Sequence, residues 1–377
     1  MQIMWFSEIK WDYLRTRKQQ IISRKPADVQ ILYLEPYVRG RRNLFRLRTE
    51  GDVFCATIPF IKSAPTFLWR TVLDRRSARR AVDFVARARI KSIVKDLRFD
   101  LPEVGLVISN IYAADIALSL PRKFLLYDCN DDHASFPGMR AWTETYFSKT
   151  SRNADAVFAS SQALLTRVAS IRGNRDDCSY LGNGVDFSHF ETANDRGVHD
   201  KPRFGYIGAL APWLDFAAVD ALARRHPEWE VVLVGPILQG VEDQVLKLTS
   251  LPNVFHLAAV SYDRLPDILK QFSVGLIPFR CNQLTRGVNP NKLYEYLAAG
   301  LPVVSTRFSE EVQNYPDLVK AVDAGEDFVA ACEQTIVGLS DGATAQDMRE
   351  KARQTAKKND WNLIAEIFWK RVSHMMS

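Results

Sequence analysis

The chain has 377 residues, of which 47% are hydrophobic and 25% are charged, and its net charge at pH 7 is +6. This composition is typical of a globular protein and excludes a collagen-like, low-complexity or disordered chain. At roughly 100–200 residues per domain, the length favours two domains over one.

The cysteines and histidines indicate neither a disulfide framework nor a metal site. The five cysteines are scattered without a CxxC pair, and no histidines have HxH or HExxH spacing. The N-terminal segment reaches Glu8 and Lys10 before any long apolar run develops, and no run of about 18 apolar residues occurs. The sequence therefore predicts a cytoplasmic protein with no membrane span, no zinc site and no resident cofactor.

Short apolar runs alternate with amphipathic segments of helical length along the whole chain. Parallel strands need crossovers long enough to form a helix, so this alternation predicts an α/β fold with parallel sheets. Strands are expected at 3–6, 29–36, 53–60, 106–109, 124–129, 156–161, 203–210, 230–236, 254–258, 273–279 and 302–306. Helices are expected at 16–24, 216–226, 241–249, 262–272 and 292–299.

The polar stretch 188–202 separates the two halves and is the best candidate for a linker. We therefore expect an N-terminal domain at 1–190, a second domain at 191–355 and a C-terminal helix at 356–377. In that last segment Trp361, Ile364, Phe368 and Val372 recur at helical spacing, so the helix must pack on something. Open α/β sheets bind ligands outside the carboxyl ends of their strands, which makes the loops there the places to look for chemistry.

Positive charge is concentrated in the first half of the chain. Residues 1–190 hold 30 Lys and Arg against 20 Asp and Glu, whereas the remainder holds 20 against 24. Much of the excess lies at 70–98, with ten basic and three acidic residues among apolar ones, and a second cluster lies at 39–48. The pattern fits a solvated helix face or attachment to anionic lipid. No nucleic-acid-binding motif accompanies it, so nucleic acid is not expected as a partner.

The loop after the first strand offers Arg17 and Trp11 as candidates for binding a ligand. A guanidinium can hold a phosphate or carboxylate through two parallel hydrogen bonds, and an indole ring presents a flat apolar face to a sugar. A Trp in an amphipathic segment is also often simply packed in the core.

The stretch 125–138, LLYDCNDDHASFPG, places Asp131, Asp132 and His133 just beyond a strand. One of the two carboxylates is a candidate general base, and His133 lies beside them as a candidate for binding a ligand. Two other interpretations stay open: a divalent metal site, and solvated Asp residues that form a turn.

The stretch 287–306, GVNPNKLYEYLAAGLPVVST, predicts a helix capped by Asn291 that ends at Gly300. A helix N-terminus attracts anions, and Lys292 adds a full charge there. Glu295 follows on the same face, where it can accept hydrogen bonds from a ribose diol. The alternative is an ordinary capped helix with exposed Lys and Glu.

This last stretch resembles the donor-site signature of GT-B glycosyltransferases of the family 4-like group. Further matches are SSQALLTRV, LGNGVDFSHF, FGYIGALAPWLDFAAVDALARRHPEWEVVLVGP and NVFHLAAVSYDRLPDILKQFSVGLIPF. The acidic loop is similar to that of bacterial polysaccharide and exopolysaccharide glycosyltransferases, including xanthan-type glucuronosyltransferases. The resemblance implies two Rossmann-like domains that face each other across a cleft, with the C-terminal helix crossing back to the first domain.

The resemblance also implies roles for individual residues. Lys292 would hold the diphosphate and Glu295 the ribose of a nucleotide sugar, and no metal would be required. The first acidic position of the family's E-x7-E pattern is Gly287 here, and the usual Arg/Lys pair in the earlier loop is replaced by APWLD. Contacts to the donor are therefore expected from a wider set: Gly208, Ala209, Thr285, Arg286, Asn289 and Asn291. The catalytic candidates are Asp132 and Asp131, one of which would take the proton of the acceptor hydroxyl, and Arg17, Trp11 and His133 would bind the acceptor.

The expected function is transfer of a sugar from a nucleoside-diphosphate donor to a hydroxyl of a lipid-linked glycan in bacterial polysaccharide biosynthesis. The basic N-terminal half would allow peripheral attachment to the inner face of the cytoplasmic membrane. A family 4-like donor motif favours retention of anomeric configuration, whereas a catalytic base at Asp132 favours inversion. Alternatives are a nucleotide-sugar epimerase of the same fold and a non-catalytic protein that binds nucleotide sugars or glycans.

Overall fold

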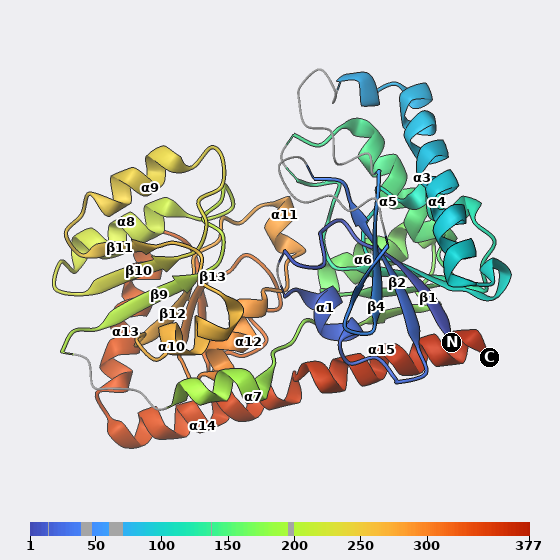
Figure 1. Cartoon of the computed structure of the whole chain (residues 1–377). Coiled ribbons are helices and arrows are strands. Elements are labelled where there is room, and N and C mark those ends of the chain that lie inside the picture. The colour runs from blue at the N-terminus through green and yellow to red at the C-terminus, as the bar shows by residue number, and fades with distance from the viewer. Residues whose placement is uncertain (14, 39–46, 60–70, 137, 195–199) are drawn as a thin grey trace. The chain divides into compact units, whose positions relative to one another are not determined.

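The computed structural model describes all residues except 14, 39–46, 60–70, 137 and 195–199 (Figure 1). The chain divides into two compact units. Unit 1 comprises Met1–Leu181 and Ala365–Ser377, and unit 2 comprises Gly182–Ile364. The sequence analysis puts the corresponding boundaries at 190 and 355, and most of the basic cluster at 39–48 lies outside the described residues.

Unit 1 contains an eight-stranded sheet in the order β3-β4-β2-β1-β5-β6-β7-β8. Neighbouring strands are parallel except β3 and β4, which are antiparallel. The strands are β1 (Gln2–Phe6), β2 (Gln30–Pro36), β3 (Arg48–Glu50), β4 (Val53–Ile58), β5 (Gly105–Ile108), β6 (Phe124–Cys129), β7 (Ala156–Ala159) and β8 (Cys178–Tyr180).

Side chains alternate across the strands, so the unit 1 sheet buries both of its faces. Met4 and Phe6 belong to one hydrophobic cluster with residues of the helices that follow the strands. Trp5, which points to the other face, stacks on Phe368 of the C-terminal helix with ring centroids 5.3 Å apart. The helices are α1 (Arg17–Ile22), α3 (Arg76–Leu97), α4 (Ala114–Ser119), α5 (Ala141–Asn153) and α6 (Gln162–Arg172).

Unit 2 contains a six-stranded, fully parallel sheet in the order β11-β10-β9-β12-β13-β14. The strands are β9 (Arg203–Ile207), β10 (Glu230–Val234), β11 (Val254–Leu257), β12 (Val274–Ile277), β13 (Val303–Thr306) and β14 (Val319–Val322). The helices are α7 (Phe187–Phe190), α8 (Phe216–Arg225), α9 (Glu242–Thr249), α10 (Leu265–Leu269), α11 (Gln283–Arg286), α12 (Asn291–Ala298), α13 (Glu326–Leu339) and α14 (Gly342–Lys358).

The C-terminal helix α15 (Trp361–Met376) returns to unit 1, as the sequence predicts. Phe368 is fully buried against Trp5 and Phe158. The indole nitrogen of Trp369 donates a hydrogen bond of 3.0 Å to the carbonyl of Ile21. The four apolar residues named from helical spacing are all buried. Among the described residues, none of the helices has the length and apolar composition that a membrane crossing requires.

Each sheet has a point where the strand order reverses, and loops from two neighbouring strands diverge there. In unit 1 this point lies between β1 and β5, and in unit 2 it lies between β9 and β12. Ligands of open α/β sheets bind outside the carboxyl ends of the strands at such points. A ligand site in unit 2 is therefore expected between the loop that begins at Gly208 and the loop that begins at Pro278.

Candidate functional site

The loop after β9 begins at Gly208, where no side chain covers the backbone. Gly208 has φ +133°, and a Cβ atom added there would lie 3.0 Å from the Nζ atom of Lys292. The Gly208 amide donates to the carbonyl of Val234, and its carbonyl is packed so closely on Gly235 that a Cβ there would meet it at 2.1 Å. Ala209 follows, and its carbonyl accepts a hydrogen bond of 2.9 Å from the Tyr206 hydroxyl. Because the chain segments at Gly208, Gly235 and Lys292 approach one another this closely, only glycine fits at position 208.

Helix α12 begins without a side-chain cap, which corrects the sequence prediction. Pro290, not Asn291, is the N-cap residue, and Asn291 is the first helical residue. Since proline fixes φ and has no polar side chain, it cannot satisfy the amides of the first turn. The Oδ1 atom of Asn291 is buried and has no hydrogen-bond partner within the described part of the chain. The start of α12 therefore retains its capacity to bind an anion.

The ammonium group of Lys292, in the first turn of α12, lies against two aromatic rings. Its Nζ atom is 4.6 Å from the ring centroid of Tyr206 and 4.7 Å from that of Phe279. The rings stabilise the cation through their faces. Burial nevertheless lowers the pKa of Lys292 to about 8, an effect that the charge of Glu295 opposes. An anion placed next to the ammonium group would restore its normal protonation.

Glu295 lies one turn further along α12. Burial raises the pKa of this carboxyl to about 7, and the charge of Lys292 opposes the shift. No ion pair within 4 Å joins Glu295 to a described cation. The two groups that the sequence assigns to a nucleotide are thus both partly desolvated, as is common for groups at functional sites.

The residues between α11 and α12 hold the loop in place. Thr285 is buried, and its hydroxyl donates to the Arg280 carbonyl at 2.5 Å and joins a capping box with Asn282. The carbonyl of Asn289, which is also buried, accepts a hydrogen bond of 2.7 Å from the Asn183 amide. Thr285 therefore shapes the loop, whereas Arg286 is exposed at its surface.

In unit 1, Asp132 is buried and held by two donors. Its Oδ2 atom accepts a hydrogen bond of 2.6 Å from Ser135 and one from Arg167, which also donates to Glu144 at 2.6 Å. The Oδ1 atom of Asp132 is buried and has no partner among the residues that the structure describes. The ion pair with Arg167 and the hydrogen bond from Ser135 therefore fix the orientation of the Asp132 carboxyl group.

The neighbours of Asp132 have different environments. Asp131 is half-buried, and its carbonyl lies 3.1 Å from the Nδ1 atom of the buried His133. The His133 ring packs edge-on against Tyr112, with centroids 6.0 Å apart. Within the described ranges, no group of three or more His, Cys, Asp and Glu side chains could hold a metal ion.

Arg17 has a structural partner that its sequence neighbourhood does not reveal. Its Nε atom donates to both oxygens of Asp128, at 2.9 and 3.1 Å, and both side chains are buried. The expectation that Arg17 presents its guanidinium to an acceptor is therefore corrected: the group is committed to an internal ion pair. Trp11 is half-buried and packs edge-on against Tyr33, with centroids 5.1 Å apart.

Further buried charges in unit 1 were not singled out from the sequence. Glu35, at the end of β2, accepts hydrogen bonds from Lys10, Arg48 and the Thr57 hydroxyl at 3.1–3.2 Å. Lys18 pairs with Glu8 at 2.6 Å. A charged residue inside an otherwise apolar strand, such as Glu35 in ILYLEP, could have indicated these buried ion pairs, because a buried charge needs a partner.

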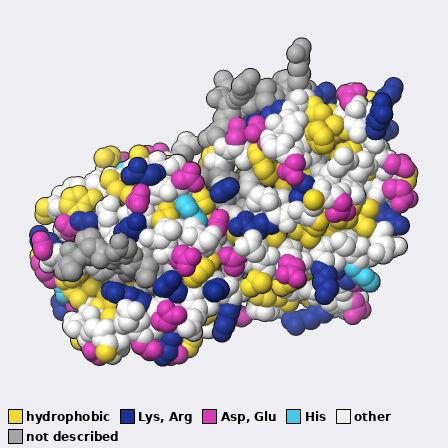
Figure 2. All heavy atoms as spheres, turned by 60° about the horizontal axis from the view of Figure 1, so that its bottom comes forward, with side chains coloured by type: hydrophobic (Ala, Val, Ile, Leu, Met, Phe, Trp, Pro, Cys, Tyr) yellow, Lys and Arg dark blue, Asp and Glu magenta, His cyan; other side chains and the backbone are white. Residues whose placement is uncertain are grey.

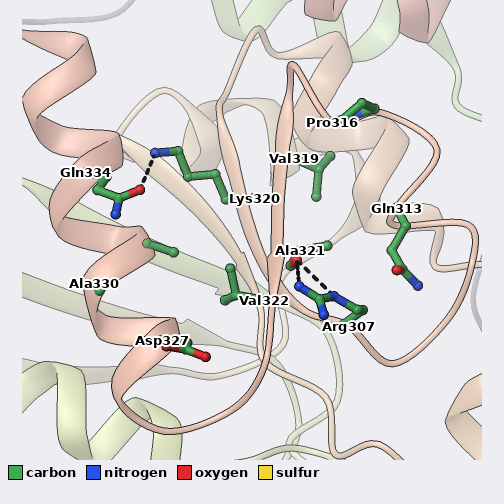
Figure 3. A pocket seen from close by; sticks show the side chains of 11 residues that line it. Arg307, Gln313, Pro316, Val319, Lys320, Ala321, Val322, Asp327, Ala330 and Gln334 are labelled. Carbon is green, nitrogen blue, oxygen red and sulfur yellow. Dashed lines mark hydrogen bonds between the residues drawn. The ribbon is translucent and has the colours of Figure 1, made fainter.

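A separate hollow of about 600 Å³ lies beside the edge strand β14 (Figure 3). Its lining includes Lys320, Arg307 and Gln334 but none of the predicted donor residues. Figure 3 shows Lys320 turned to Gln334, at 3.2 Å, and Arg307 turned to the Ala321 carbonyl. Both cations therefore have partners within the protein, and nothing assigns a ligand to this hollow.

Comparison with known proteins connects this geometry with sugar transfer. Residues 201–337 match the family described as Glycosyl transferases group 1. TuaH of Bacillus subtilis, assigned as a teichuronic acid biosynthesis glycosyltransferase, is 28% identical over 259 residues. That match covers 64% of this chain and 64% of the relative, so it spans less than two thirds of the relative's length.

Solved structures share the fold over the whole chain. Sucrose-phosphate synthase of Thermosynechococcus elongatus is 12% identical, with a TM-score of 0.75 and coverage of 100% of this chain and 99% of that one. HepE of Anabaena in complex with UDP and glucose is 18% identical, with a TM-score of 0.70 and coverage of 99% of both chains. A trehalose-6-phosphate protein of E. coli bound with UDP-2-fluoro glucose is 13% identical, with a TM-score of 0.71 and coverage of 100% and 99%. The predicted GT-B fold is confirmed, and the comparisons support a glycosyltransferase in a bacterial polysaccharide context.

Proposed function

We propose that this chain is a glycosyltransferase that moves a sugar from a nucleoside-diphosphate donor to a hydroxyl group of a lipid-linked glycan in bacterial polysaccharide biosynthesis. The observation that carries the proposal is the position of Lys292, at the uncapped start of α12 and beside the bare backbone of Gly208. The family match includes both residues. The UDP and UDP-sugar ligands of the structural neighbours support a nucleotide-sugar donor.

In the proposed reaction, the protein positions the substrates and stabilises the departing diphosphate. Lys292 and the amides of the first turn of α12 bind the diphosphate, and Glu295 accepts hydrogen bonds from the ribose hydroxyls. Asn289, Asn291, Ala209 and Arg286 belong to the same donor site. No bound metal is required, because the lysine and the helix start supply the positive charge that leaving-group stabilisation needs.

Asp132 is assigned to the acceptor. Its contacts with Arg167 and Ser135 hold the carboxyl group in place, so we assign it to orienting the acceptor hydroxyl through Oδ1, which has no partner among the described residues. The bond from the anomeric carbon to the diphosphate oxygen breaks, the bond to the acceptor oxygen forms, and the diphosphate takes the acceptor's proton. This route retains the anomeric configuration. A product of inverted configuration in the NMR spectrum would contradict it.

The proposed acceptor is lipid-linked, and unit 1 offers a surface that suits anionic lipid. On α3, Arg80, Phe84, Lys91 and Lys95 lie on one exposed stripe, and the Phe84 side chain is 68% exposed. Of the two acidic residues of α3, Asp83 is buried and Asp96, which follows Lys95, is exposed. Figure 2 shows Lys and Arg interspersed with Asp and Glu over the face that it presents. Salt-sensitive co-sedimentation with anionic vesicles that is lost in Phe84→Asp is expected, and sedimentation independent of salt would refute the assignment.

The central test measures donor binding and turnover together. UDP, GDP, ADP and dTDP, followed by the corresponding nucleotide sugars, are screened by thermal shift and calorimetry against the wild type, Lys292→Ala and Glu295→Ala. We expect one nucleotide to bind the wild type and to lose about 10–100-fold in affinity in each variant, the effect of removing a hydrogen bond to a charged group. Binding that ignores both substitutions would overturn the site.

The second candidate is a non-catalytic nucleotide-sugar binding protein. It is favoured by Gly287, which stands where the resembling family has an acidic residue. Binding of a donor without its hydrolysis or transfer to any glycan acceptor would support it. Epimerisation of the donor sugar without an acceptor would instead identify an epimerase.

A further inference from the structure

The phenolic hydroxyl of Tyr206 borders the place where Lys292 approaches the backbone after β9. A Cβ atom added at Gly208 would lie 3.0 Å from the Nζ atom of Lys292 and 3.3 Å from the Tyr206 hydroxyl oxygen. The Nζ atom itself lies 3.4 Å from that oxygen and 4.6 Å from the centroid of the same ring. Tyr206 therefore contacts Lys292 both through its aromatic face and through its oxygen.

The hydrogen bonds of this hydroxyl determine what it presents to Lys292. A phenol has one proton to donate, and Tyr206 donates it to the Ala209 carbonyl at 2.9 Å. Burial raises the pKa of the Tyr206 hydroxyl far above its usual value, an effect that the Trp213 indole opposes, so the hydroxyl keeps its proton in the range where Lys292 titrates. The oxygen therefore faces the ammonium group as a hydrogen-bond acceptor only.

The other groups around the ammonium of Lys292 do not offer an acceptor. Among the described residues, the Tyr206 hydroxyl is the only hydrogen-bond partner of Nζ. Phe279, whose ring centroid lies 4.7 Å away, has no lone pair, and Gly208 has no side chain. Glu295, one turn further along α12, favours the charged form of the lysine, but no ion pair within 4 Å joins these two described side chains. The hydroxyl is thus the nearest group that stabilises the charge through a lone pair.

We infer that Tyr206 is a positioning residue of the donor site: its hydroxyl, oriented by the Ala209 carbonyl, keeps Lys292 in the charged form that binds the diphosphate. The inference rests on the proposed function, which assigns the diphosphate to Lys292. Burial disfavours the charged form of a lysine, and an oxygen that can only accept opposes this effect. An ammonium group has three N–H donors, so the others remain for the phosphate oxygens. Tyr206 acts through Lys292 and needs no contact with the nucleotide.

The test separates the hydroxyl from the ring. Tyr206→Phe removes only the oxygen and keeps the ring that fills the core. Calorimetry from pH 6.5 to 9.5 compares this variant with the wild type, using the nucleoside diphosphate that binds in the central test. Loss of a hydrogen bond to a charged group should lower the pKa of Lys292 by about one unit. The variant should therefore bind about tenfold more weakly at pH 9 and within about twofold of the wild type at pH 6.5, where Lys292 is mostly charged in both.

Two further variants show whether the effect depends on the lysine. In a Lys292→Arg background the guanidinium stays charged at every pH used, so adding Tyr206→Phe should cause no loss that varies with pH. Tyr146→Phe is the matched control, because it removes the hydroxyl of another buried tyrosine, which donates to Asp115 in unit 1 at 3.1 Å. Nucleotide affinity should not change in this control. The titration of the Lys292 side chain, followed by NMR without nucleotide, should show the same shift in Tyr206→Phe.

Three results would overturn the role of Tyr206. An equal loss in Tyr206→Phe at every pH would mean that the hydroxyl shapes the site or contacts the nucleotide itself. No loss would mean that the hydroxyl does not contribute to binding. A loss that varies with pH in the same way in the Lys292→Arg background would mean that another group titrates. If no nucleoside diphosphate binds the wild type, the proposed function itself fails.

Discussion

Charged residues that follow the strands of unit 1 meet their partners inside the protein, whereas those at the donor loops of unit 2 do not. Arg17 is paired with Asp128, and Lys10 with Glu35, all four of them buried. In unit 2, Lys292 contacts aromatic rings rather than a carboxylate, and Arg280 extends into solvent. Internal pairs fix the shape of a unit, while charges without a counterion at a loop indicate where a ligand of opposite charge is bound.

The largest effect that follows from this comparison is on the stability of unit 1. Arg17→Ala leaves Asp128 as a buried charge without its partner, and we expect a loss of about 3–5 kcal/mol in the free energy of unfolding. Urea denaturation measures it. Lys123→Ala, which removes a surface ion pair with Glu103, should cost no more than about 1 kcal/mol. Equal losses in the two variants would remove the distinction between internal and surface pairs.

The next largest effect is expected at Gly208 of unit 2, where no side chain covers the backbone. Gly208→Ala places a methyl group against Lys292 at a φ of +133°, so we expect backbone strain of about 1–3 kcal/mol and a loss of nucleotide binding. Gly240→Ala is the matched control. Gly240 also has a positive φ, of +93°, but nothing lies within 4 Å of the added atom. If both variants bind nucleotide equally well, close approach at Gly208 is not required for binding.

A smaller, graded effect should appear when pH is varied. Lys292, whose pKa is lowered to about 8, loses its charge as pH rises through that value, so nucleotide affinity should fall about tenfold per pH unit above it. Glu295, whose pKa is raised to about 7, loses its charge as pH falls, so affinity should also decrease below about 7. Calorimetry from pH 5.5 to 9.5 measures this profile. Lys292→Arg should keep its affinity above pH 8, and a flat wild-type profile would contradict the role of the lysine.

The same two pKa shifts affect stability in opposite directions. The folded chain holds Lys292 less tightly protonated than the unfolded chain does, so its contribution to stability rises with pH between about 8 and 10.5. The raised pKa of Glu295 makes its contribution fall as pH rises from about 4.5 to 7. Nucleotide binding should reduce both trends, because it gives each charged group a partner.

The smallest effect is expected from removing metal ions. In the proposed function, Lys292 and the start of α12 stabilise the diphosphate, so EDTA should change the rate of donor turnover by less than about twofold. The rate is compared before and after dialysis against EDTA, and again after Mg²⁺ or Mn²⁺ is added. A loss of activity that either ion restores would assign part of this task to a metal.

The sequence predicts the strands well where burial dominates. All eleven runs expected to form strands do so, because strands buried on both faces of a parallel sheet have continuous apolar sequences of this length. The strands β3, β8 and β14 were not predicted. They have three or four residues and lie at sheet edges, and apart from Val319 their side chains are only partly buried or exposed, so their sequences contain no continuous apolar run.

In the site, too, the sequence predicts what depends on neighbouring residues and misses contacts between residues far apart in the chain. Lys292 and Glu295 could be named because they lie within one turn of each other and beside a recognisable loop. The wrong assignment of the cap to Asn291 arose because propensity favours Asn over Pro at that position, whereas the extended backbone of Pro290 begins the helix. The pairing of Arg17 could not be foreseen, since Asp128 is 111 residues away and only the folded sheet brings them together.

Helix α15 has a consequence for how the chain is made. Unit 1 contains the first 181 residues and the last thirteen, and Phe368 packs on Trp5 from the first strand. Nascent chains fold from the N-terminus as they leave the ribosome. The first unit to be synthesised is thus the last to be completed, and its apolar surface around Trp5 and Phe158 stays uncovered until α15 has been synthesised.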